Sequence, residues 1–437
     1  MTIGHIIATV LIGIIAAAAR AAQGSWFFPG PIFALYWFVQ ALLSLVDEQF
    51  RTSPETLYWI AGTCLVLAIA NYVGGGRVEP VRPGQERRVQ IEHQLPLLVV
   101  GTIGSALFLI LSEARGVRLS VEAAPAWIQI LLMFNYFTTF VAGVSAASAS
   151  RAKTVLFLLP LLPPLALSIL TTGRLAFLLP LLYWIGGFIS VRIVERGGRL
   201  KAFKPKLLLG VLAGAVLAAL FVNIIHDFRR VSVIGSSASD RVQAFERVLT
   251  NGVSHKESDD ARRTILGQIY SFDYYLTRQL ASPEPPRWGT VMFRGPLIAL
   301  GYDVPRLPFE SFEMTPGYLW NTYTILRPPI TDFGLLGSLG FWAAVGVVQG
   351  FAYRRARRGR LYWLIVIAWF YVELPLIGGL FFSYNIINLA HVIAAVYLAI
   401  AGRWVTDGRR IRPTTGRRDR RSSGELVATA AYGWGIR

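Results

Sequence analysis

Long apolar runs separated by short polar stretches dominate the chain and predict membrane-spanning helices. A helix needs about 20 predominantly apolar residues to cross the hydrocarbon core of a bilayer. We predict eleven spans, at 3–19, 31–46, 56–76, 95–112, 125–145, 154–170, 174–191, 206–225, 333–352, 361–380 and 383–402. The second span is short and the tenth contains Pro375, but packed neighbours can satisfy the backbone groups that such features leave free.

Arginine and lysine alternate between the connections of these spans, and this predicts an orientation. One set of connections is basic and holds Arg20; Arg77, Arg82, Arg87 and Arg88; Arg151 and Lys153; Arg192, Arg196, Arg199, Lys201, Lys204 and Lys206; Arg354, Arg355, Arg357, Arg358 and Arg360; and the C-terminal tail. The short connections of the other set hold only Arg51, Arg115, Arg118 and Arg174. By the positive-inside rule the basic set is cytoplasmic, so the N-terminus is outside and the C-terminus inside.

One external connection, residues 226–332, is too long for an ordinary loop and is rich in aromatic residues, so we expect it to fold. Within it, 253–280 is predicted to be a helix because apolar residues recur at three- and four-residue steps, at Ile265, Ile269, Phe272 and Leu276. Segment 281–330 is punctuated by Pro and Gly and is predicted to be irregular. The tail 403–437 is rich in Arg, Gly and Ser and is predicted to be disordered.

The predicted fold is therefore an all-α polytopic membrane protein with one large, partly helical periplasmic loop. Residues 1–225 would carry the first eight spans, 226–332 the loop domain, and 333–402 the last three spans. The first apolar run has no basic residue before it, so we expect a retained helix rather than a signal peptide.

Composition agrees with a membrane protein. The chain is 54% hydrophobic and only 16% charged, whereas a soluble domain carries about a quarter charged residues. A net charge of +18 would suggest nucleic acid as the partner of a soluble protein. Here the cations lie between apolar runs, where they face anionic headgroups, so no nucleic-acid partner is expected. The lone Cys64 excludes a disulfide framework, and the scattered histidines form no zinc pattern, so we expect no metal or other cofactor.

Arginines of the external loop are the first candidates for chemistry. The loop holds eleven arginines but only one lysine, Lys256. Guanidinium is a planar fork that can grip phosphate at two points, which suits a phosphate or pyrophosphate headgroup. A genomic bias towards arginine codons would produce the same excess. Arg174 is a stronger candidate than the loop arginines, because it lies in a tight hairpin at the external membrane edge. A charge there needs an ion-pair partner or a functional role, unless its side chain snorkels to the interface.

A denser pattern precedes span nine, in residues 317–334. It combines aromatic, amide, cationic and acidic side chains, at Tyr318, Asn321, Tyr323, Arg327 and Asp332. Aromatic faces stack on sugar rings, and Asn and Asp can pair with hydroxyl groups. The alternative interpretation is an aromatic belt at the membrane surface followed by an acidic helix start.

Ionisable residues inside the last two spans are further candidates. Glu373 and His391 both lie roughly 10–12 Å below the external surface by helical rise, so they could meet. Intramembrane ionisable groups mark functional sites by default, although the neighbouring Asn385 and Asn388 are equally suited to helix–helix hydrogen bonds. The acidic pair Asp47-Glu48 could bind a divalent cation, but an isolated pair is too little to predict a metal site.

At these residues the chain resembles the bacterial oligosaccharide repeat-unit polymerases, the Wzy-type O-antigen and exopolysaccharide polymerases. The hairpin Thr172-Gly173-Arg174 opens an apolar span, a single large external loop comes late in the chain, and Asn321, Tyr323, Arg327, Asp332 and Gly334 lead into the next span. The architecture matches over most of the chain and the motifs over short segments.

The resemblance implies a GT-C-type glycosyltransferase of the bacterial inner membrane. Such enzymes transfer a glycan from undecaprenyl pyrophosphate to another lipid-linked repeat unit at the periplasmic face, without a metal, alongside a flippase and a chain-length regulator. It implies pyrophosphate binding by Arg174 and Arg327, with Arg278 a looser match. Tyr318, Asn321 and Tyr323 are the candidates for sugar binding by their own side-chain chemistry.

Two steps of this reaction fit the residues. Fixed guanidinium groups can stabilise the charge that builds on a departing pyrophosphate. The acceptor hydroxyl needs a base, for which the candidates are Asp332, Glu373 and His391. Two alternatives stay open: an O-antigen ligase that uses the same donor, and a lipid-linked oligosaccharide flippase or transporter, against which the long external loop counts.

Overall fold

The computed structural model describes residues 2–46, 51–76, 87–92, 94–114, 126–171, 174–196, 257–304, 312–315, 318–320, 324–374 and 385–406. Its α-helices are α1 (Ile3–Gln23), α2 (Pro29–Val46), α3 (Pro54–Gly75), α4 (Gln94–Ala114), α5 (Ala126–Ser148), α6 (Arg151–Leu156), α7 (Leu162–Thr171), α8 (Arg174–Arg196), α11 (Glu257–Ala281), α12 (Arg294–Ala299), α13 (Arg327–Arg357), α14 (Leu364–Glu373) and α15 (Asn385–Ala401). Two 3₁₀ turns, η2 (Leu159–Leu161) and η4 (Leu361–Trp363), precede α7 and α14. Four short strands are β1 (Arg87–Ile91), β2 (Phe312–Thr315), β3 (Tyr318–Trp320) and β4 (Gly402–Thr406).

Seven helices of the described chain are long and apolar enough to cross a membrane, namely α1, α2, α3, α4, α5, α8 and α13. Three shorter apolar helical segments lie at 153–168, 361–373 and 387–401. The prediction of an all-α chain built from apolar spans is confirmed in this coarser form. The predicted span 206–225 lies outside the described residues, so the number eleven stays a prediction.

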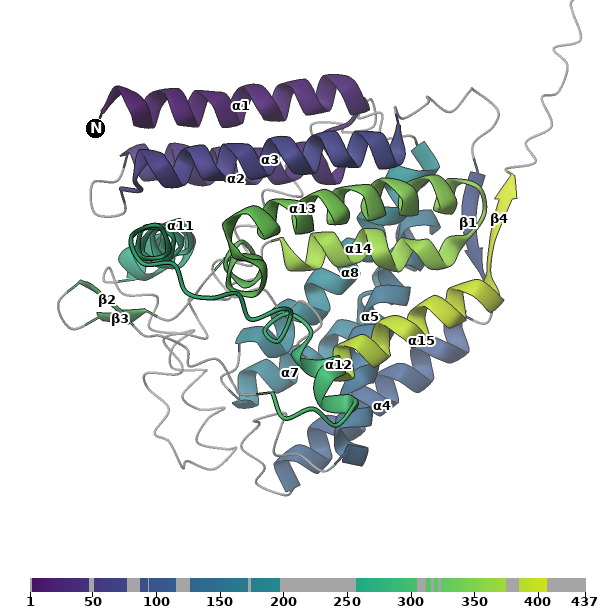
Figure 1. Cartoon of the computed structure of the whole chain (residues 1–437). Helices are drawn as coiled ribbons and strands as arrows, with labels where there is room; N and C mark the ends of the chain where they lie inside the picture. The colour runs from purple at the N-terminus through teal and green to yellow at the C-terminus, as the bar shows by residue number, and fades with distance from the viewer. Residues whose placement is uncertain are drawn as a thin grey trace, which may run out of the picture.

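The helices form two groups that share α13 and α14 (Figure 1). In the first group α1, α2 and α3 run side by side, with α3 against α13. In the second group α4, α8 and α15 pack on α5, and α7 packs on α8 and α4. Helix α11 crosses one end of the first group, which we call the α11 end. Strands β1 and β4 lie at the other end, the β1–β4 end.

Each group has its own hydrophobic core. Trp37 of α2 and Trp342 of α13 are fully buried in the first core, together with apolar residues of α11. Phe140 of α5 and Tyr183 of α8 lie in the second. Helix α13 contributes to both cores, because its later residue Tyr353 packs in the second. The position of α13 therefore couples the two groups.

Small residues allow the central helices to approach closely. A Cβ atom at Gly346 of α13 would lie 2.7 Å from the carbonyl oxygen of Leu67 in α3. Asn71 of α3 donates from Nδ2 to the carbonyl oxygen of Gly346, at 3.2 Å. In α8, a Cβ at Gly187 would lie 2.5 Å from the carbonyl oxygen of Phe140 in α5. Such contacts are the usual basis of helix association in lipid, where apolar burial provides little driving force.

The predicted span 154–170 is not a single helix. It consists of α6, η2 and α7, and the interruption coincides with Pro160, Pro163 and Pro164. Proline lacks a backbone N–H and clashes with the preceding turn, so a run of apolar residues here cannot form one continuous helix.

The start of the tail is a strand, which corrects the prediction that 403–437 is disordered from its first residue. Strand β4 pairs with β1 in antiparallel register, with Arg403 opposite Gln90. Arg403 also forms a 2.9 Å ion pair with Glu92. The buried Glu195 of α8 accepts a hydrogen bond from the backbone N–H of Val89 through Oε1, at 3.2 Å. The remainder of the tail lies outside the described residues.

Within residues 226–332, the predicted helix is present, but the segment after it contains regular elements and the next helix begins earlier than predicted. Helix α11 is the predicted helix, and Ile269, Phe272 and Leu276 are fully buried as its periodicity implies. Segment 281–330 contains α12 and the two-stranded sheet β2–β3 as well as irregular chain. Helix α13 begins at Arg327, six residues before the predicted span, and kinks at Gly334 (φ 72°). The predicted boundary therefore coincides with the kink.

Candidate functional site

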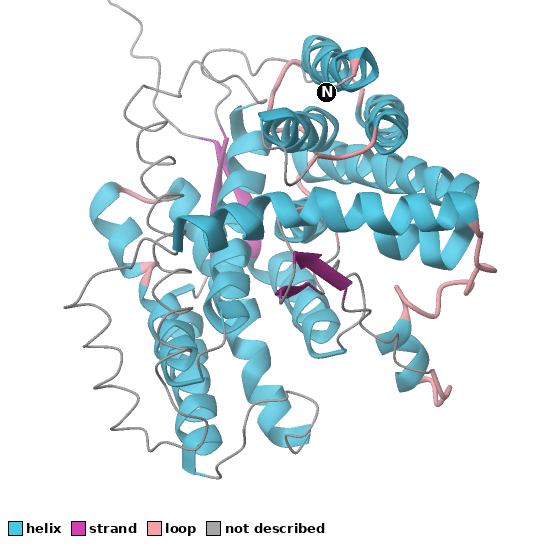
Figure 2. Cartoon of the chain, turned by 90° about the vertical axis from the view of Figure 1, so that its left-hand side faces the viewer, coloured by secondary structure: helices cyan, strands magenta, loops and turns pink. Residues whose placement is uncertain are grey.

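Helix α11 presents polar side chains to the first turns of α13 at the α11 end. Figure 2, which looks onto this end, shows α11 lying across the bundle. Asp273 accepts two hydrogen bonds from Ser53, one from its backbone N–H at 3.1 Å and one from its hydroxyl. Tyr36 of α2 donates to Gln268 at 2.6 Å. These contacts fix α11 on α2 and the start of α3, and Tyr275, two helical turns after Gln268, contacts the first turns of α13.

Arg327, the first residue of α13, is held against α11. Its side chain is 9% exposed, and its guanidinium carbon lies 4.8 Å from the ring centroid of Tyr275. The hydroxyls of Tyr275 and Thr331 share a hydrogen bond of 2.9 Å, and Thr331 also donates to the Arg327 carbonyl oxygen at 3.2 Å. Stacking on an aromatic ring fixes the plane of a guanidinium.

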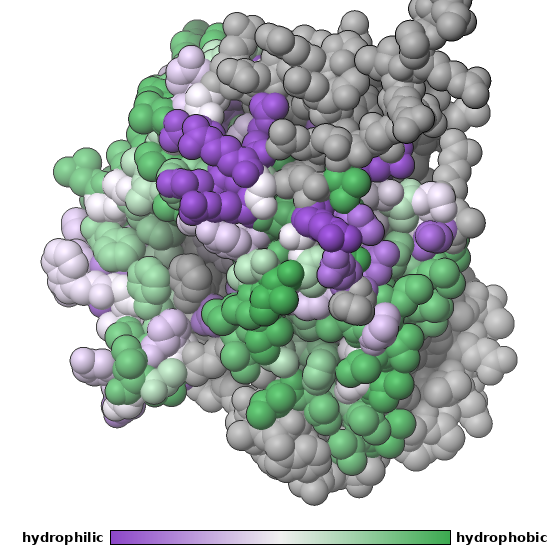
Figure 3. Space-filling model, turned by 90° about the vertical axis from the view of Figure 1, so that its right-hand side faces the viewer, coloured by the Kyte–Doolittle hydropathy of each residue, from purple (hydrophilic) through white to green (hydrophobic). Residues whose placement is uncertain are grey.

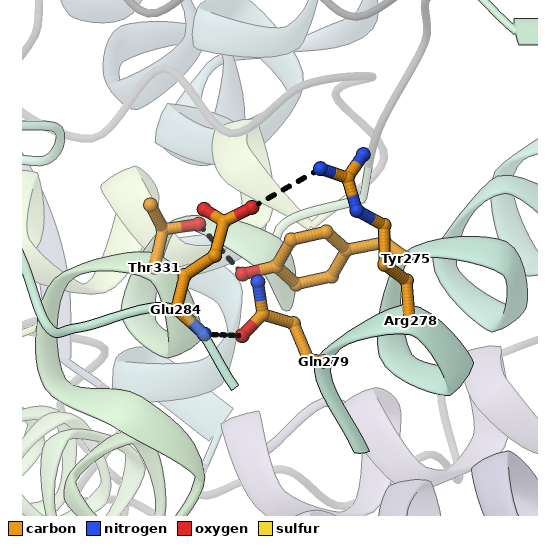
Figure 4. Close-up of polar contacts among 5 residues, drawn as sticks. All are labelled: Tyr275, Arg278, Gln279, Glu284 and Thr331. Carbon is orange, nitrogen blue, oxygen red and sulfur yellow. Dashed lines mark hydrogen bonds and ion pairs between the residues drawn. The ribbon is translucent and has the colours of Figure 1, made fainter. Parts of the chain in front are cut away.

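Arg278 lies one turn beyond Tyr275, on the same face of α11. Its guanidinium forms an ion pair with Glu284 at 3.4 Å, and Gln279 accepts from the Glu284 backbone N–H at 3.2 Å (Figure 4). The paired side chains are 50% and 41% exposed. Exposed pairs contribute little to stability, so a ligand of higher charge can displace Glu284 from Arg278.

Backbone N–H groups at the start of α13 contribute little to anion binding. The Arg327 N–H donates to the carbonyl oxygen of Thr324, at 3.2 Å. The next two residues, Pro328 and Pro329, have no N–H. Positive charge at this helix end therefore comes mainly from the Arg327 side chain, supplemented by the helix dipole.

Asp332, predicted as a base, is fully buried and is bonded through its side chain and its backbone. One carboxylate oxygen accepts from the Val291 backbone N–H at 3.0 Å, and the other accepts from that of Met292 at 2.8 Å. Its carbonyl oxygen accepts from the Trp288 N–H at 2.8 Å. Since a base must reach the proton that it removes, this geometry favours a role for Asp332 in fixing the loop 287–292.

Asp332→Asn tests that role. The amide keeps the shape but replaces one acceptor by a donor, so one of the two loop N–H groups would face an N–H₂ group without an acceptor. We expect the free energy of unfolding to fall by about 1–3 kcal/mol. The midpoint of chemical or thermal denaturation in detergent measures this, with Asp303→Asn, at an exposed carboxylate beyond α12, as the control. Unchanged stability would show that the carboxylate does not hold the loop.

A second polar group lies deeper in the bundle. His391 of α15 and the hydroxyl of Tyr183 of α8 are joined by a 2.5 Å hydrogen bond. Glu373 is buried at the end of α14, which packs against α8, the helix that carries Tyr183. The structure thus brings His391 to Tyr183 and places Glu373 on a neighbouring helix. Tyr183 was missed by sequence analysis, because one tyrosine in an apolar span gives no signal of its own.

Glu373 lies deeper in the bundle than Arg327. The side-chain amide of Gln349 in α13 donates to the Val366 carbonyl oxygen in α14, at 2.7 Å. The connection between these helices is short, so they run antiparallel, and Glu373, seven residues beyond Val366, is level with the middle of α13 and not with its start at Arg327.

The other predicted residues are placed only in part. Arg174 begins α8, and since Glu195 at the far end of that helix bonds to β1, the helix starts towards the α11 end. Its side chain is outside the described set. Tyr318 belongs to β3, where its backbone pairs opposite Thr315. Asn321 and Tyr323 lie outside the described residues.

No three His, Cys, Asp or Glu side chains gather as a metal site would require within the described ranges. The pair Asp47-Glu48 lies outside those ranges.

Comparisons with protein-family models, with curated proteins and with solved structures found no match. Function is therefore inferred from the residues and their geometry.

Proposed function

We propose that the protein is a lipid-pyrophosphate-dependent glycosyltransferase that polymerises oligosaccharide repeat units on undecaprenyl pyrophosphate. The observation that supports this most is the stacking of Arg327, at the start of α13, on Tyr275 of α11, with Arg278 one helical turn beyond that tyrosine. Two of the three arginines expected to bind pyrophosphate are thus carried by helices that meet at Tyr275.

The two arginines suit different parts of the task. Arg327 is buried and stacked, so its guanidinium needs no reorientation when charge develops on the leaving pyrophosphate. Arg278 is exposed and paired with Glu284, so it can exchange that carboxylate for a phosphate oxygen as the donor enters.

The reaction exchanges one bond to the anomeric carbon for another. The acceptor hydroxyl oxygen bonds to the anomeric carbon of the donor, and the bond from that carbon to the pyrophosphate oxygen breaks. The hydroxyl proton passes to a base, for which Glu373, with His391 behind Tyr183, is our candidate. The pyrophosphate lipid leaves with the bonding electron pair, and its charge is stabilised by the arginines.

Charge distribution supports placing this site outside the cytoplasm. Figure 3 looks onto the β1–β4 end and shows hydrophilic side chains gathered beside apolar surface. Exposed arginines at this end are Arg88, Arg354, Arg358, Arg360 and Arg403. By the positive-inside rule this end faces the cytoplasm, so the α11 end faces the periplasm of a bacterial inner membrane.

The test is to reconstitute the purified protein in vesicles with an undecaprenyl-pyrophosphate-linked oligosaccharide and to separate the products by length, with and without EDTA. We expect longer chains on lipid pyrophosphate, unaffected by the chelator. Transfer only to an added lipid A core acceptor would indicate a ligase. Absence of products, or activity that EDTA removes and manganese restores, would contradict the proposal.

A further inference from the structure

A strained turn follows α11 and carries an exposed tryptophan. The Thr290 N–H donates to the Arg287 carbonyl oxygen at 3.3 Å, so residues 287–290 form a β-turn. Both central residues have positive φ, 52° for Trp288 and 90° for Gly289. Turns of this kind favour Asn, Asp or Gly at the first central position, since a larger side chain clashes with its own backbone there. Trp288 is the one non-glycine residue with positive φ in the described chain.

The surrounding backbone imposes this conformation. The N–H of Arg287 donates to the Thr331 carbonyl oxygen at 3.1 Å, and that of Trp288 donates to the Asp332 carbonyl oxygen at 2.8 Å. Immediately after the turn, the Asp332 carboxylate accepts from the N–H groups of Val291 and Met292. Strained residues persist where their neighbours over-determine them, and they cluster at functional sites.

Packing does not explain why tryptophan occupies the turn. The Trp288 side chain is 78% exposed, so the strain is not offset by burial in a core. The side chain that follows the turn and does enter the core is Met292, which is fully buried. The fold therefore anchors the chain through Met292 and Asp332 while it presents the indole to the outside.

The turn is linked rigidly to the arginine site. Thr331 accepts from the turn through its carbonyl oxygen and bonds to Tyr275 through its hydroxyl. Tyr275 is the ring on which Arg327 stacks. Trp288 and Arg327 are thus fixed to the same two turns of α13, which end at the Gly334 kink.

We propose that Trp288 is a platform on which a sugar ring of the lipid-linked glycan stacks, an inference that rests on the proposed function. The apolar C–H face of a pyranose matches an indole face, and a platform tied to Arg327 would hold the sugar next to the pyrophosphate. A role in the aromatic belt of the membrane surface needs no strained turn. Tyr58, 42% exposed on the regular helix α3, has the exposure for such a role.

Trp288→Asn separates binding from folding, because asparagine is favoured in the left-handed conformation. The probes are undecaprenyl pyrophosphate and the same lipid carrying an oligosaccharide repeat unit, and the readout is the dissociation constant for protein in detergent. We expect the variant to bind the glycan-bearing lipid at least about tenfold more weakly, the scale of one stacking contact. Binding of the bare lipid should be unchanged, and the melting temperature should be equal or higher.

Two further variants complete the test. Trp288→Phe keeps an aromatic face and should retain most of the glycan-dependent affinity, whereas Tyr58→Ala removes an exposed aromatic side chain of the same bundle end and should bind both lipids as wild type does. Wild-type binding of both lipids by Trp288→Asn overturns the platform but leaves the proposed function intact. If Trp288→Asn weakens binding of both lipids equally, or if Tyr58→Ala weakens binding as well, Trp288 has a membrane-anchoring role and the platform is overturned. A wild-type protein that binds neither lipid overturns the proposed function and the platform together.

Discussion

Replacing Arg327 by alanine is expected to abolish the formation of long polymer. A preorganised positive group aimed at charge that develops in the transition state is typically worth a factor of about 100–1,000 in rate. Arg327 is the buried and oriented member of the pair, so its loss should exceed that of Arg278, whose exposed guanidinium is already shared with Glu284. The measurement is the initial rate of chain extension in vesicles, at equal amounts of folded protein.

Two substitutions separate charge from packing at this position. Arg327→Met keeps much of the aliphatic volume against Tyr275 but has no charge, so it should be as inactive as alanine while remaining closer to wild type in stability. Arg327→Lys keeps the charge but not the planar fork, so it should also be impaired. If the methionine variant extends chains at the wild-type rate, Arg327 is a packing residue and the pyrophosphate site is elsewhere.

The apolar helices could be predicted because their signal is local. A span needs a run of apolar residues, and such a run is visible in the sequence wherever it occurs. The predicted start of span five at 125 and the observed start of α5 at Ala126 differ by one residue. Helix α11 was equally accessible, since the three-and-four-residue recurrence of Ile269, Phe272 and Leu276 directly encodes a buried face.

Pairing between distant segments could not be predicted. Strands β1 and β4 are each five residues long and are separated by most of the chain, and β1 contains Arg87 and Arg88. Nothing in either segment indicates a partner, because the ladder depends on where α4, α8 and α15 end. The ion pair of Arg403 with Glu92 is likewise a product of tertiary structure.

The site shows the same division. The types of residue at Arg327, Arg278 and Glu373 carry their own chemical signal, so sequence alone could nominate them. Their neighbours cannot be found in that way: Tyr275 and Tyr183 are ordinary aromatic residues until the fold places a guanidinium or an imidazole beside them. Asp332 shows what the residue type alone leaves out: a carboxylate before a span indicated a base, and its bonds to the N–H groups of Val291 and Met292 appear only in the fold.

Substituting Gly346 is expected to have a large effect on folding. A Cβ at this position would lie 2.7 Å from the Leu67 carbonyl oxygen and 2.8 Å from the Ala70 Cβ. The first is a backbone atom of α3 and the second is bonded directly to that backbone, so neither can move aside by a side-chain rotation. Gly346→Ala should therefore lower the free energy of unfolding by about 1–3 kcal/mol through overpacking. Gly346→Leu should prevent α3 and α13 from packing, and little protein should survive extraction and size-exclusion chromatography.

Gly340 provides a matched control on the same helix, because no atom lies within 4 Å of where its Cβ would be. Gly340→Ala should be neutral or stabilising by up to about 1 kcal/mol, since glycine in a helix interior is unfavourable relative to alanine. If Gly346→Ala and Gly340→Ala have the same melting temperature, α3 and α13 do not approach as closely as described. A Cβ at Gly346 would push α13 away from α3, and α13 carries Arg327 at its start and Trp342 in the first core. This displacement would also alter the arginine site. The Gly346→Ala protein that does fold should therefore extend chains more slowly than Gly340→Ala protein.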